Sequence, residues 1–259
     1  MTLQSIALVG LPNSGKTSLF NALTGSRQKV ANYPGVTVER KEGWIPSHDL
    51  RVLDLPGAYS LDSRTPDEEI TRDVVLGRHS SETQPELIVA VADATNLERN
   101  LGLVLELKQL GMPMVLALNM MDLAEKRGLK LDLAVLEREL GVKVVPTVAV
   151  QGKGLEELLH EVKNRRGPAP ARCPWKKPTP QEVRARFSRV DEVLGLAIQS
   201  RSRPATLTHA IDRVVLHPVF GVLILILTLA LMFQAIFSWS HIPADWIEAG
   251  VNLLGAKMG

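Results

Sequence analysis

Residues 10–17 read Gly-Leu-Pro-Asn-Ser-Gly-Lys-Thr and fit the phosphate-binding pattern G-x-x-x-x-G-K-[ST]. Glycines let the backbone curl until several N–H groups point at phosphate oxygens, and a helix that starts there adds the positive end of its dipole. We expect Lys16 to reach the β- and γ-phosphates and Thr17 to offer its hydroxyl to Mg²⁺. A chance glycine-rich turn is the alternative, and the strand and helix patterns on either side argue against it. The other residues expected to contact the nucleotide here are Gly10, Asn13, Ser14, Gly15 and Ser18.

A second motif, Asn119-Met120-Met121-Asp122, indicates which base is bound. An Asp at its last position can accept hydrogen bonds from the N1–H and the exocyclic amine of guanine, and adenine has no matching pair of donors. We therefore expect GTP and GDP as ligands, in contact with Asn119, Met120 and Asp122. The usual motif is N-K-x-D, so Met120 is expected to weaken binding without changing the choice of base. The alternative is that Asn119 and Asp122 only cap a helix.

Further positions match features that surround the nucleotide in GTPases. Residues 54–57 fit D-x-x-G, so we expect Asp54 to hold Mg²⁺ through water and the Gly57 N–H to sense the γ-phosphate. Thr37 follows the first helix and can close on Mg²⁺ through its hydroxyl. GTPases carry S-A-x beside the guanine O6, and we expect Val148 and Ala149 at that place, although only the Ala of the pattern is kept.

Phosphoryl transfer depends mainly on positioning and charge neutralisation. Many small GTPases follow D-x-x-G with a Gln that orients the attacking water, and Ala58 at that position cannot do so. Asn13 resembles the carboxamide with which potassium-activated GTPases help to hold K⁺, so K⁺ is a candidate activator. An Asn selected for turn geometry is the alternative. The residues expected to act in catalysis are Asn13, Lys16, Thr37 and Gly57.

These motifs need a sheet that presents several strand ends on one side. Short apolar runs alternate with helical patterns over residues 1–165, which predicts a mostly parallel sheet with helices on both faces, an α/β fold of the P-loop GTPase type. The expected strands cover 6–9, 39–45, 50–53, 86–92, 114–119 and 142–148. The expected helices cover 16–24, 96–110, 132–140 and 155–165. The last three strand runs are almost wholly apolar, as is typical of interior strands.

The C-terminal part has a different character. Residues 166–213 are rich in Pro and Arg, with one helical pattern at 181–199, whereas 219–239 carry no charge. About 20 apolar residues in a helix span a bilayer core, so we expect a transmembrane helix, with a buried core helix as the alternative. The expected domains are a GTP-binding (G) domain at 1–165, a linker with a shortened helical spacer at 166–213, the transmembrane helix at 214–240 and the start of an extracytoplasmic segment at 241–259.

The distribution of Lys and Arg predicts the orientation of this span. Short flanks rich in Lys and Arg stay on the cytoplasmic side of a membrane. After the span Lys257 is the only basic residue, so we expect the G domain in the cytoplasm and 240–259 outside. The basic residues that precede the span include Lys176, Lys177, Arg184, Arg186, Arg189, Arg201, Arg203 and Arg213.

Composition argues against other partners. A formal net charge of +2 with 22% charged residues is not typical of a protein that binds nucleic acid. The single Cys173 excludes an internal disulfide and any CxxC metal site. His209, His217 and His241 could suggest a metal site, but no carboxylate or thiol stands at ligand spacing from them.

Three segments, 32–39, 54–61 and 211–218, together resemble the FeoB family of bacterial ferrous-iron transporters. They read Asn-Tyr-Pro-Gly-Val-Thr-Val-Glu, Asp-Leu-Pro-Gly-Ala-Tyr-Ser-Leu and Ile-Asp-Arg-Val-Val-Leu-His-Pro, and the Asn-Met-Met-Asp motif adds to the likeness. The resemblance covers 1–165 and 206–240. It implies a cytosolic G domain, a helical spacer and a bacterial inner-membrane domain that carries Fe²⁺.

Two departures from that family matter. FeoB proteins usually place a larger helical bundle, proposed to slow GDP release, where 166–204 has one convincing helix. The sequence stops shortly after one span, so we interpret it as a fragment or a truncated product. The alternatives to a GTPase module for Fe²⁺ uptake are a membrane-anchored GTPase of unrelated signalling or assembly function and a GTP-binding switch that does not hydrolyse. The oligomeric state is open, a homo-oligomer included.

Overall fold

The computed structural model describes residues 4–25, 28–33, 36–62, 65–165, 175–201, 211 and 214–239. The chain divides into two compact units, Met1–Arg203 and Pro204–Gly259, which are considered separately. Cys173, His209, His241 and the expected extracytoplasmic segment at 241–259 lie outside the described residues.

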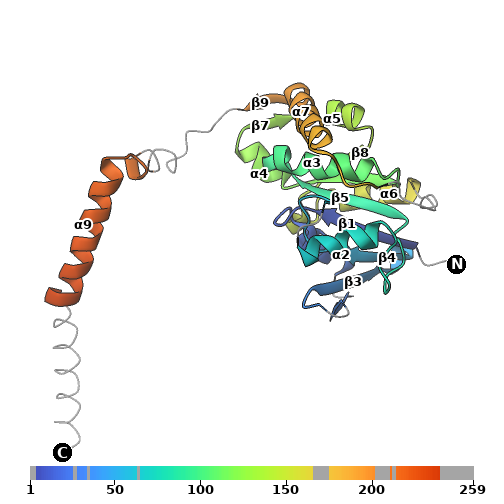
Figure 1. The fold of residues 1–259 in the computed structure, drawn as a ribbon, viewed down its shortest axis with the longest axis horizontal. Coiled ribbons are helices and arrows are strands. Elements are labelled where there is room, and N and C mark those ends of the chain that lie inside the picture. The colour runs from blue at the N-terminus through green and yellow to red at the C-terminus, as the bar shows by residue number, and fades with distance from the viewer. Residues whose placement is uncertain are drawn as a thin grey trace, which may run out of the picture. The chain divides into compact units, whose positions relative to one another are not determined.

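The first unit is built on one seven-stranded sheet (Figure 1). Its strands, in spatial order, are β2 (Gln28–Asn32), β3 (Glu39–Ile45), β4 (Leu50–Asp54), β1 (Gln4–Gly10), β5 (Leu87–Asp93), β6 (Met114–Asn119) and β8 (Lys143–Pro146). Pairing is parallel from β4 to β8, and β3 runs antiparallel to both β2 and β4. Parallel strands end at the same edge, so the carboxyl ends of β1, β4, β5 and β6 lie together there.

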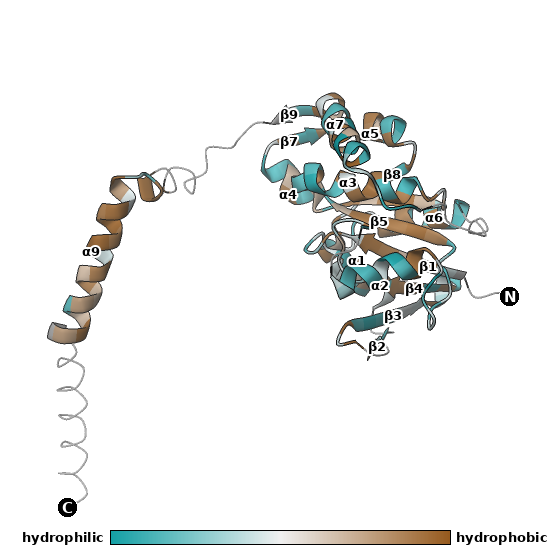
Figure 2. Ribbon diagram, in the orientation of Figure 1, coloured by the Kyte–Doolittle hydropathy of each residue, from teal (hydrophilic) through white to brown (hydrophobic). Residues whose placement is uncertain are grey.

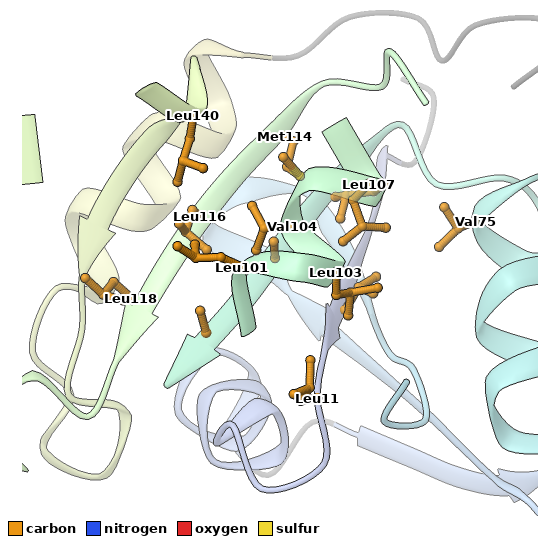
Figure 3. Packing of buried hydrophobic residues seen from close by; sticks show 14 of the residues in the cluster. Leu11, Val75, Leu101, Leu103, Val104, Leu107, Met114, Leu116, Leu118 and Leu140 are labelled. Atoms are coloured by element: carbon orange, nitrogen blue, oxygen red, sulfur yellow. The ribbon is translucent and has the colours of Figure 1, made fainter. Parts of the chain in front are cut away.

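Helices cover both faces of the sheet, as the sequence predicts. They are α1 (Lys16–Thr24), α2 (Pro66–Val75), α3 (Leu97–Lys108), α4 (Met121–Lys126), α5 (Leu133–Leu140), α6 (Leu155–Asn164) and α7 (Pro180–Ala197). One apolar cluster joins the sheet to α2, α3, α5 and α7, and a second joins it to α1 and α6. Figure 3 shows the first cluster, in which Leu101 and Val104 of α3 lie beside Leu116 of β6.

Most of the expected elements are present, with ends that differ by at most two residues. The run at 142–148 gives only the short strand β8, and β8 is an edge strand instead of an interior one. The Thr147 N–H still bonds to Leu118 O of β6, and the strand stops there because Val148 pairs with Lys153 instead of with β6. Strand β2 and helix α2 were not predicted from the sequence. A strand whose five residues are all exposed carries no apolar alternation that could reveal it.

Helix α7 packs on the same core as the G domain. Thr179 and Glu182 form a reciprocal capping box at its start, and its buried residues belong to the first apolar cluster. These buried residues are Val190, Val193, Leu194 and Ala197. In Figure 1 the helix lies next to α3 and α5. It continues into β9 (Ile198–Arg201), which pairs antiparallel with β7 (Leu129–Leu131) directly after α4.

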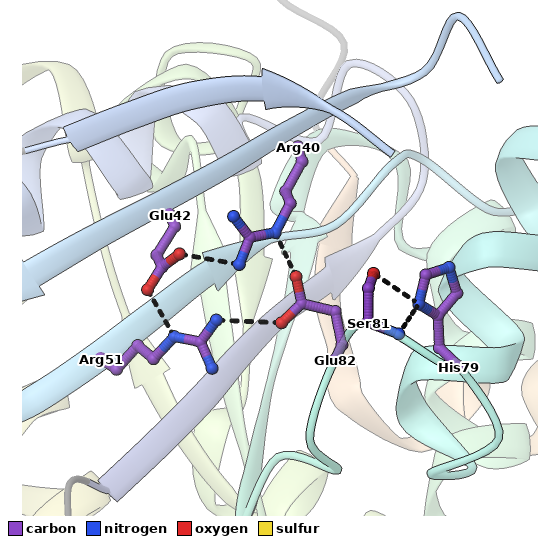
Figure 4. A network of polar contacts seen from close by, with 6 residues as sticks. All are labelled: Arg40, Glu42, Arg51, His79, Ser81 and Glu82. Atoms are coloured by element: carbon purple, nitrogen blue, oxygen red, sulfur yellow. Dashed lines mark hydrogen bonds and ion pairs between the residues drawn. The ribbon is translucent and has the colours of Figure 1, made fainter. Parts of the chain in front are cut away.

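A buried charge network fixes the β3–β4 side of the sheet (Figure 4). The fully buried carboxylate of Glu82 pairs with Arg40 of β3 and, at 2.9 Å, with Arg51 of β4. Glu42 completes the network by accepting from Arg51 at 2.6 Å. A buried carboxylate that loses a partner becomes strongly unfavourable, so the network holds the loop after α2 against these strands.

The second unit contains α9 (Phe220–Gln234), continued by a π-helical turn at Ala235–Trp239. Its residues are almost all apolar, with Thr228 and Gln234 as the polar exceptions, and Figure 2 shows α9 as mostly brown. By length and composition, the 18 residues Phe220–Phe237 could cross a membrane. This window lies inside the transmembrane helix expected at 214–240 and inside the uncharged run 219–239.

Candidate nucleotide-binding site

The loop between β1 and α1 has the conformation that a phosphate cradle requires. Asn13 and Gly15 both have positive φ, 64° and 86°. Such left-handed residues are typical of loops in which successive backbone N–H groups form an anion-binding concavity. A Cβ at position 15 would fall on Nδ2 of Asn119, so only glycine fits there. Asn13 is exposed, whereas Ser14 is buried and its hydroxyl has no hydrogen-bond partner among the described residues.

Lys16 begins α1 and its side chain folds back over the loop. Its Nζ donates to Gly10 O at 3.0 Å and to Leu11 O at 2.9 Å. Burial lowers the pKa of Lys16 to about 8, although the charge of Asp54 acts in the opposite direction. The ammonium is therefore held at the mouth of the loop by two carbonyls, in reach of any anion that enters it.

Thr17 and Asp54 meet at the adjoining ends of α1 and β4. The Thr17 hydroxyl donates to Asp54 Oδ2 at 2.9 Å, and the buried Oδ1 has no hydrogen-bond partner among the described residues. Burial raises the pKa of Asp54, against the opposing effects of the Thr17 hydrogen bond and the charge of Lys16. Hydroxyl and carboxylate oxygens are the ligands that Mg²⁺ prefers, and the unpartnered oxygen is a free acceptor, so these residues fit a magnesium ion.

Asn119 ties the phosphate loop to the loop after β8. Its Nδ2 donates to Ser14 O at 3.2 Å, and its Oδ1 accepts from the Ala149 N–H at 3.1 Å and from the Thr147 hydroxyl at 3.4 Å. Met120 follows with φ 62°, and its Cε lies 3.4 Å from where a Cβ on Gly15 would be. Asn119 is thus a structural bridge between three segments.

Asp122 lies in the first turn of α4, opposite the Ala149 loop. Its Oδ2 accepts from Gln151 Nε2 at 3.3 Å, which leaves Oδ1 free to accept another donor. Ala149 and Val148 are both buried, at 4% and 7% exposed, and Val148 pairs with Lys153. Gln151 was not predicted from the sequence, because a polar residue in an exposed turn gives no signal of its own.

The D-x-x-G segment lies against the phosphate loop. A Cβ on Gly57 would stand 2.8 Å from the Pro12 nitrogen, and the Ala58 N–H donates to Gly10 O at 3.2 Å. Thr37, by contrast, is exposed and lines a different pocket. That pocket is formed by Asn32, Tyr33, Val36, Thr37, Val38, Pro66 and Asp67, with no residue of the phosphate loop among the lining residues described. The structure therefore gathers Lys16, Thr17, Asp54 and Gly57 but leaves Thr37 apart.

Beyond Gly57 the chain runs to a buried carboxylate that the sequence analysis also missed. Glu106 of α3 accepts from the Ser60 hydroxyl at 2.7 Å and from the Leu61 N–H at 2.6 Å. It also pairs with Arg186 of α7. The available sequence signal is a single acidic residue within the leucine-rich stretch 101–110.

Comparisons with known proteins identify the family and the fold. A family model described as "Ferrous iron transport protein B" matches residues 4–162. The chain belongs to the FeoB family. The Fe(2+) transporter FeoB of Campylobacter jejuni is 38% identical over 257 residues, which cover 96% of this chain and 41% of that protein. The chain thus spans about two fifths of that FeoB relative.

Solved FeoB structures share the fold. The cytosolic domain of the T. maritima FeoB iron transporter matches in its GDP form I with 30% identity and a TM-score of 0.66, over 76% of this chain and 99% of that one. Its GMPPNP form matches with 31% identity and a TM-score of 0.64, over 76% and 100%. The mostly parallel sheet with helices on both faces is therefore the G-domain fold of FeoB, as expected from the sequence.

Proposed function

We propose that this FeoB chain binds guanine nucleotides with Mg²⁺ and hydrolyses GTP to GDP and phosphate. One observation carries the proposal: Lys16, the Thr17–Asp54 pair and the Asn119 bridge to Ala149 meet at neighbouring strand ends. The relative from T. maritima, solved in GDP and GMPPNP forms, supports it. The direct test is calorimetric titration with GTP, GDP and ATP, followed by a phosphate-release assay. Equal affinity for ATP and GTP would contradict the proposal.

Each residue has a part in this reaction. Lys16 neutralises charge on the β- and γ-phosphates, and the backbone N–H groups of 13–17 bind the phosphate oxygens. Thr17 and Asp54 would hold a magnesium ion, which would neutralise charge on the phosphates. Gly57 offers its N–H to the γ-phosphate, and Thr37 moves in from its exposed position when GTP is bound. Asp122 accepts from guanine while Asn119 keeps the base loop and the phosphate loop together.

We propose further that this activity serves Fe²⁺ uptake, with the nucleotide site in the cytoplasm and α9 in the bacterial inner membrane. The support is family membership, the length and apolarity of α9, and the excess of Lys and Arg before it. A test replaces the matching part of the C. jejuni relative by this chain and measures ferrous-iron uptake in cells that lack their own transporter. Uptake that does not depend on Lys16 would favour a GTPase of unrelated function.

The burial of Lys16 makes nucleotide affinity depend on pH. Phosphate oxygens favour the ammonium form, so binding raises the pKa of Lys16 above its free value of about 8. Affinity for GDP should change little near pH 7 and fall by up to about tenfold per pH unit above pH 8, because Lys16 of the nucleotide-free protein loses its proton there. Calorimetry between about pH 7 and pH 9 measures this slope. Lys16→Arg keeps its charge over this range, so its affinity for GDP should show no such slope. Parallel pH profiles of the wild type and Lys16→Arg would show that Lys16 does not cause the pH dependence.

Thr37→Ala should lower the rate of GTP hydrolysis by about 10²-fold, because a magnesium ligand present only in the triphosphate state is lost. Affinity for GDP should stay within about twofold, since Thr37 lies away from the phosphate loop in the described structure. Thr37→Ser keeps the hydroxyl and is the control. If Thr37→Ala weakened GDP and GTP alike, the role of Thr37 as a switch residue would be wrong.

Replacing Na⁺ by K⁺ at constant ionic strength should raise the hydrolysis rate by about tenfold or more, and Asn13→Ala should remove the increase. The reasons are the exposed carboxamide of Asn13 in the loop and the absence of a Gln at position 58. Asn21→Ala, on an exposed face of α1, is the matched control. Identical rates in the two salts would refute the role of potassium.

A further inference from the structure

Three contacts join the segment after Gly57 to the chain around α7. The first is the buried carboxylate of Glu106, which is 4% exposed and is shared by Ser60, Leu61 and Arg186. The other two lie further out. Lys177 pairs with Asp62 at 3.1 Å, and the guanidinium of Arg72 in α2 lies 5.9 Å from the ring centre of Trp175.

Glu106 accepts hydrogen bonds both from the segment after Gly57 and from α7, so a change in its contacts with one affects its contacts with the other. Its Oε2 accepts from the Leu61 N–H, and its Oε1 accepts from Arg186, while the Ser60 hydroxyl reaches both oxygens. Arg186 is itself largely buried, and its Nε has no hydrogen-bond partner among the described residues. A shift of Ser60 or Leu61 therefore changes the pairing of a buried cation, which is strongly unfavourable unless α7 moves too.

The surroundings leave room for such a shift. Tyr59 and Phe187, both more than half exposed, line one cavity together with Val183 and Glu106. The contact between the segment after Gly57 and α7 is thus polar and buried at Glu106 but open beside it. Side chains at a solidly packed interface could not be displaced as easily.

We propose that Glu106 couples the turn formed by residues 57–61 to α7, so that γ-phosphate sensing at Gly57 and the docking of α7 are linked. This inference rests on the proposed GTP binding. Because coupling between two sites is reciprocal, α7 then alters the preference for GTP over GDP by the same factor as the nucleotide alters the docking of α7. Helix α7 continues into β9, and β9 pairs with β7, so the same linkage reaches the chain that follows the base-binding α4.

The test compares Arg186→Met with Arg189→Met in the full chain. Both changes remove one guanidinium from α7, three residues apart, but Arg189 pairs with Glu139 of α5 at 2.9 Å and with Glu192. The measured quantity is the ratio of affinities for GMPPNP and GDP. Arg186→Met should change this ratio by about fivefold or more, the usual scale of coupling between sites, whereas Arg189→Met should leave it within about twofold.

Amide hydrogen exchange supplies a second readout that general destabilisation would not mimic. In the wild type, exchange from α7 should differ between the GDP and GMPPNP states, and Arg186→Met should abolish that difference. Glu106→Gln combined with Arg186→Gln removes both charges together and should behave as Arg186→Met does, which keeps the test valid should a lone buried charge unfold the protein.

Two results would overturn the inference. One is an affinity ratio that Arg186→Met and Arg189→Met change equally. The other is α7 exchange that is the same in both nucleotide states of the wild type. Failure of the wild type to bind any guanine nucleotide is a different result, because it would overturn the proposed function itself.

Discussion

Lys16→Ala should lower the rate of GTP hydrolysis by about three orders of magnitude or more, which corresponds to about 4 kcal/mol of transition-state stabilisation. The substitution removes the one cation that the described structure holds inside the phosphate loop, where two carbonyls bind it at 2.9 and 3.0 Å. Charge neutralisation is most of what a protein contributes to phosphoryl transfer, so little else can compensate. Single-turnover phosphate release at saturating GTP and Mg²⁺ measures the effect.

Lys163→Ala is the matched control, because Lys163 is exposed in the last turn of α6. It should leave the rate unchanged. Thr17→Ala should reproduce the loss by removing the hydroxyl that bonds Asp54, and Thr17→Ser should restore much of it. Loss of one stabilising group usually lowers the rate by about 10²–10³-fold. A Lys16→Ala protein whose rate stayed within about tenfold of the wild type would therefore disprove the role of this loop.

Asp122→Asn should reverse the choice of base. In the proposed site the carboxylate would accept from two donors of guanine, whereas an Asn offers one acceptor and one donor, which suits xanthine with its carbonyl at C2. Affinity for GTP should fall by about 10²-fold, and the ratio of GTP to XTP affinity should change by about 10³-fold or more, because a mismatched site leaves buried polar groups unpaired. Competition binding with the two nucleotides measures the ratio.

Glu125→Gln is the control for that experiment. It changes a carboxylate to an amide on the same short helix, at an exposed position three residues further along. It should leave both affinities unchanged. An unaltered GTP to XTP ratio in Asp122→Asn would show that another group reads the base.

The parts of the site that could be predicted are those whose local structure depends only on a short stretch of neighbouring residues. Residues 10–17 fix a strand, a turn and the start of a helix, and so place Lys16 and Thr17 without reference to the rest of the molecule. The parallel sheet followed from apolar runs such as 114–119, because strands buried on both faces tolerate few polar residues. Roles for Asp54 and Asp122 could be predicted because Asp54 ends one such strand and Asp122 comes shortly after another, and these roles stay predictions.

The remainder depends on contacts between distant segments. Glu106 and Arg186 are 80 residues apart, and each alone is typical of a solvent-exposed helix position. Helix α7 was predicted, but its packing on α3 and α5 could not be, because the sequence does not show which surface covers its apolar stripe. Thr37 was expected beside Mg²⁺, and the structure instead leaves it exposed. That position stays a prediction for the GTP-bound state.

The pairing of β7 with β9 has a mechanical consequence. The two strands are antiparallel, so Arg201, where the chain leaves towards α9, lies opposite Leu129, where it arrives from α4. A pulling force applied at Arg201 loads the Arg201–Leu129 pair first, so the strands separate one residue pair at a time from that end. Such a geometry yields at low force, and the first pair to open is the one nearest α4. Tension from the C-terminal side would therefore reach the base-binding segment before it disturbs α7.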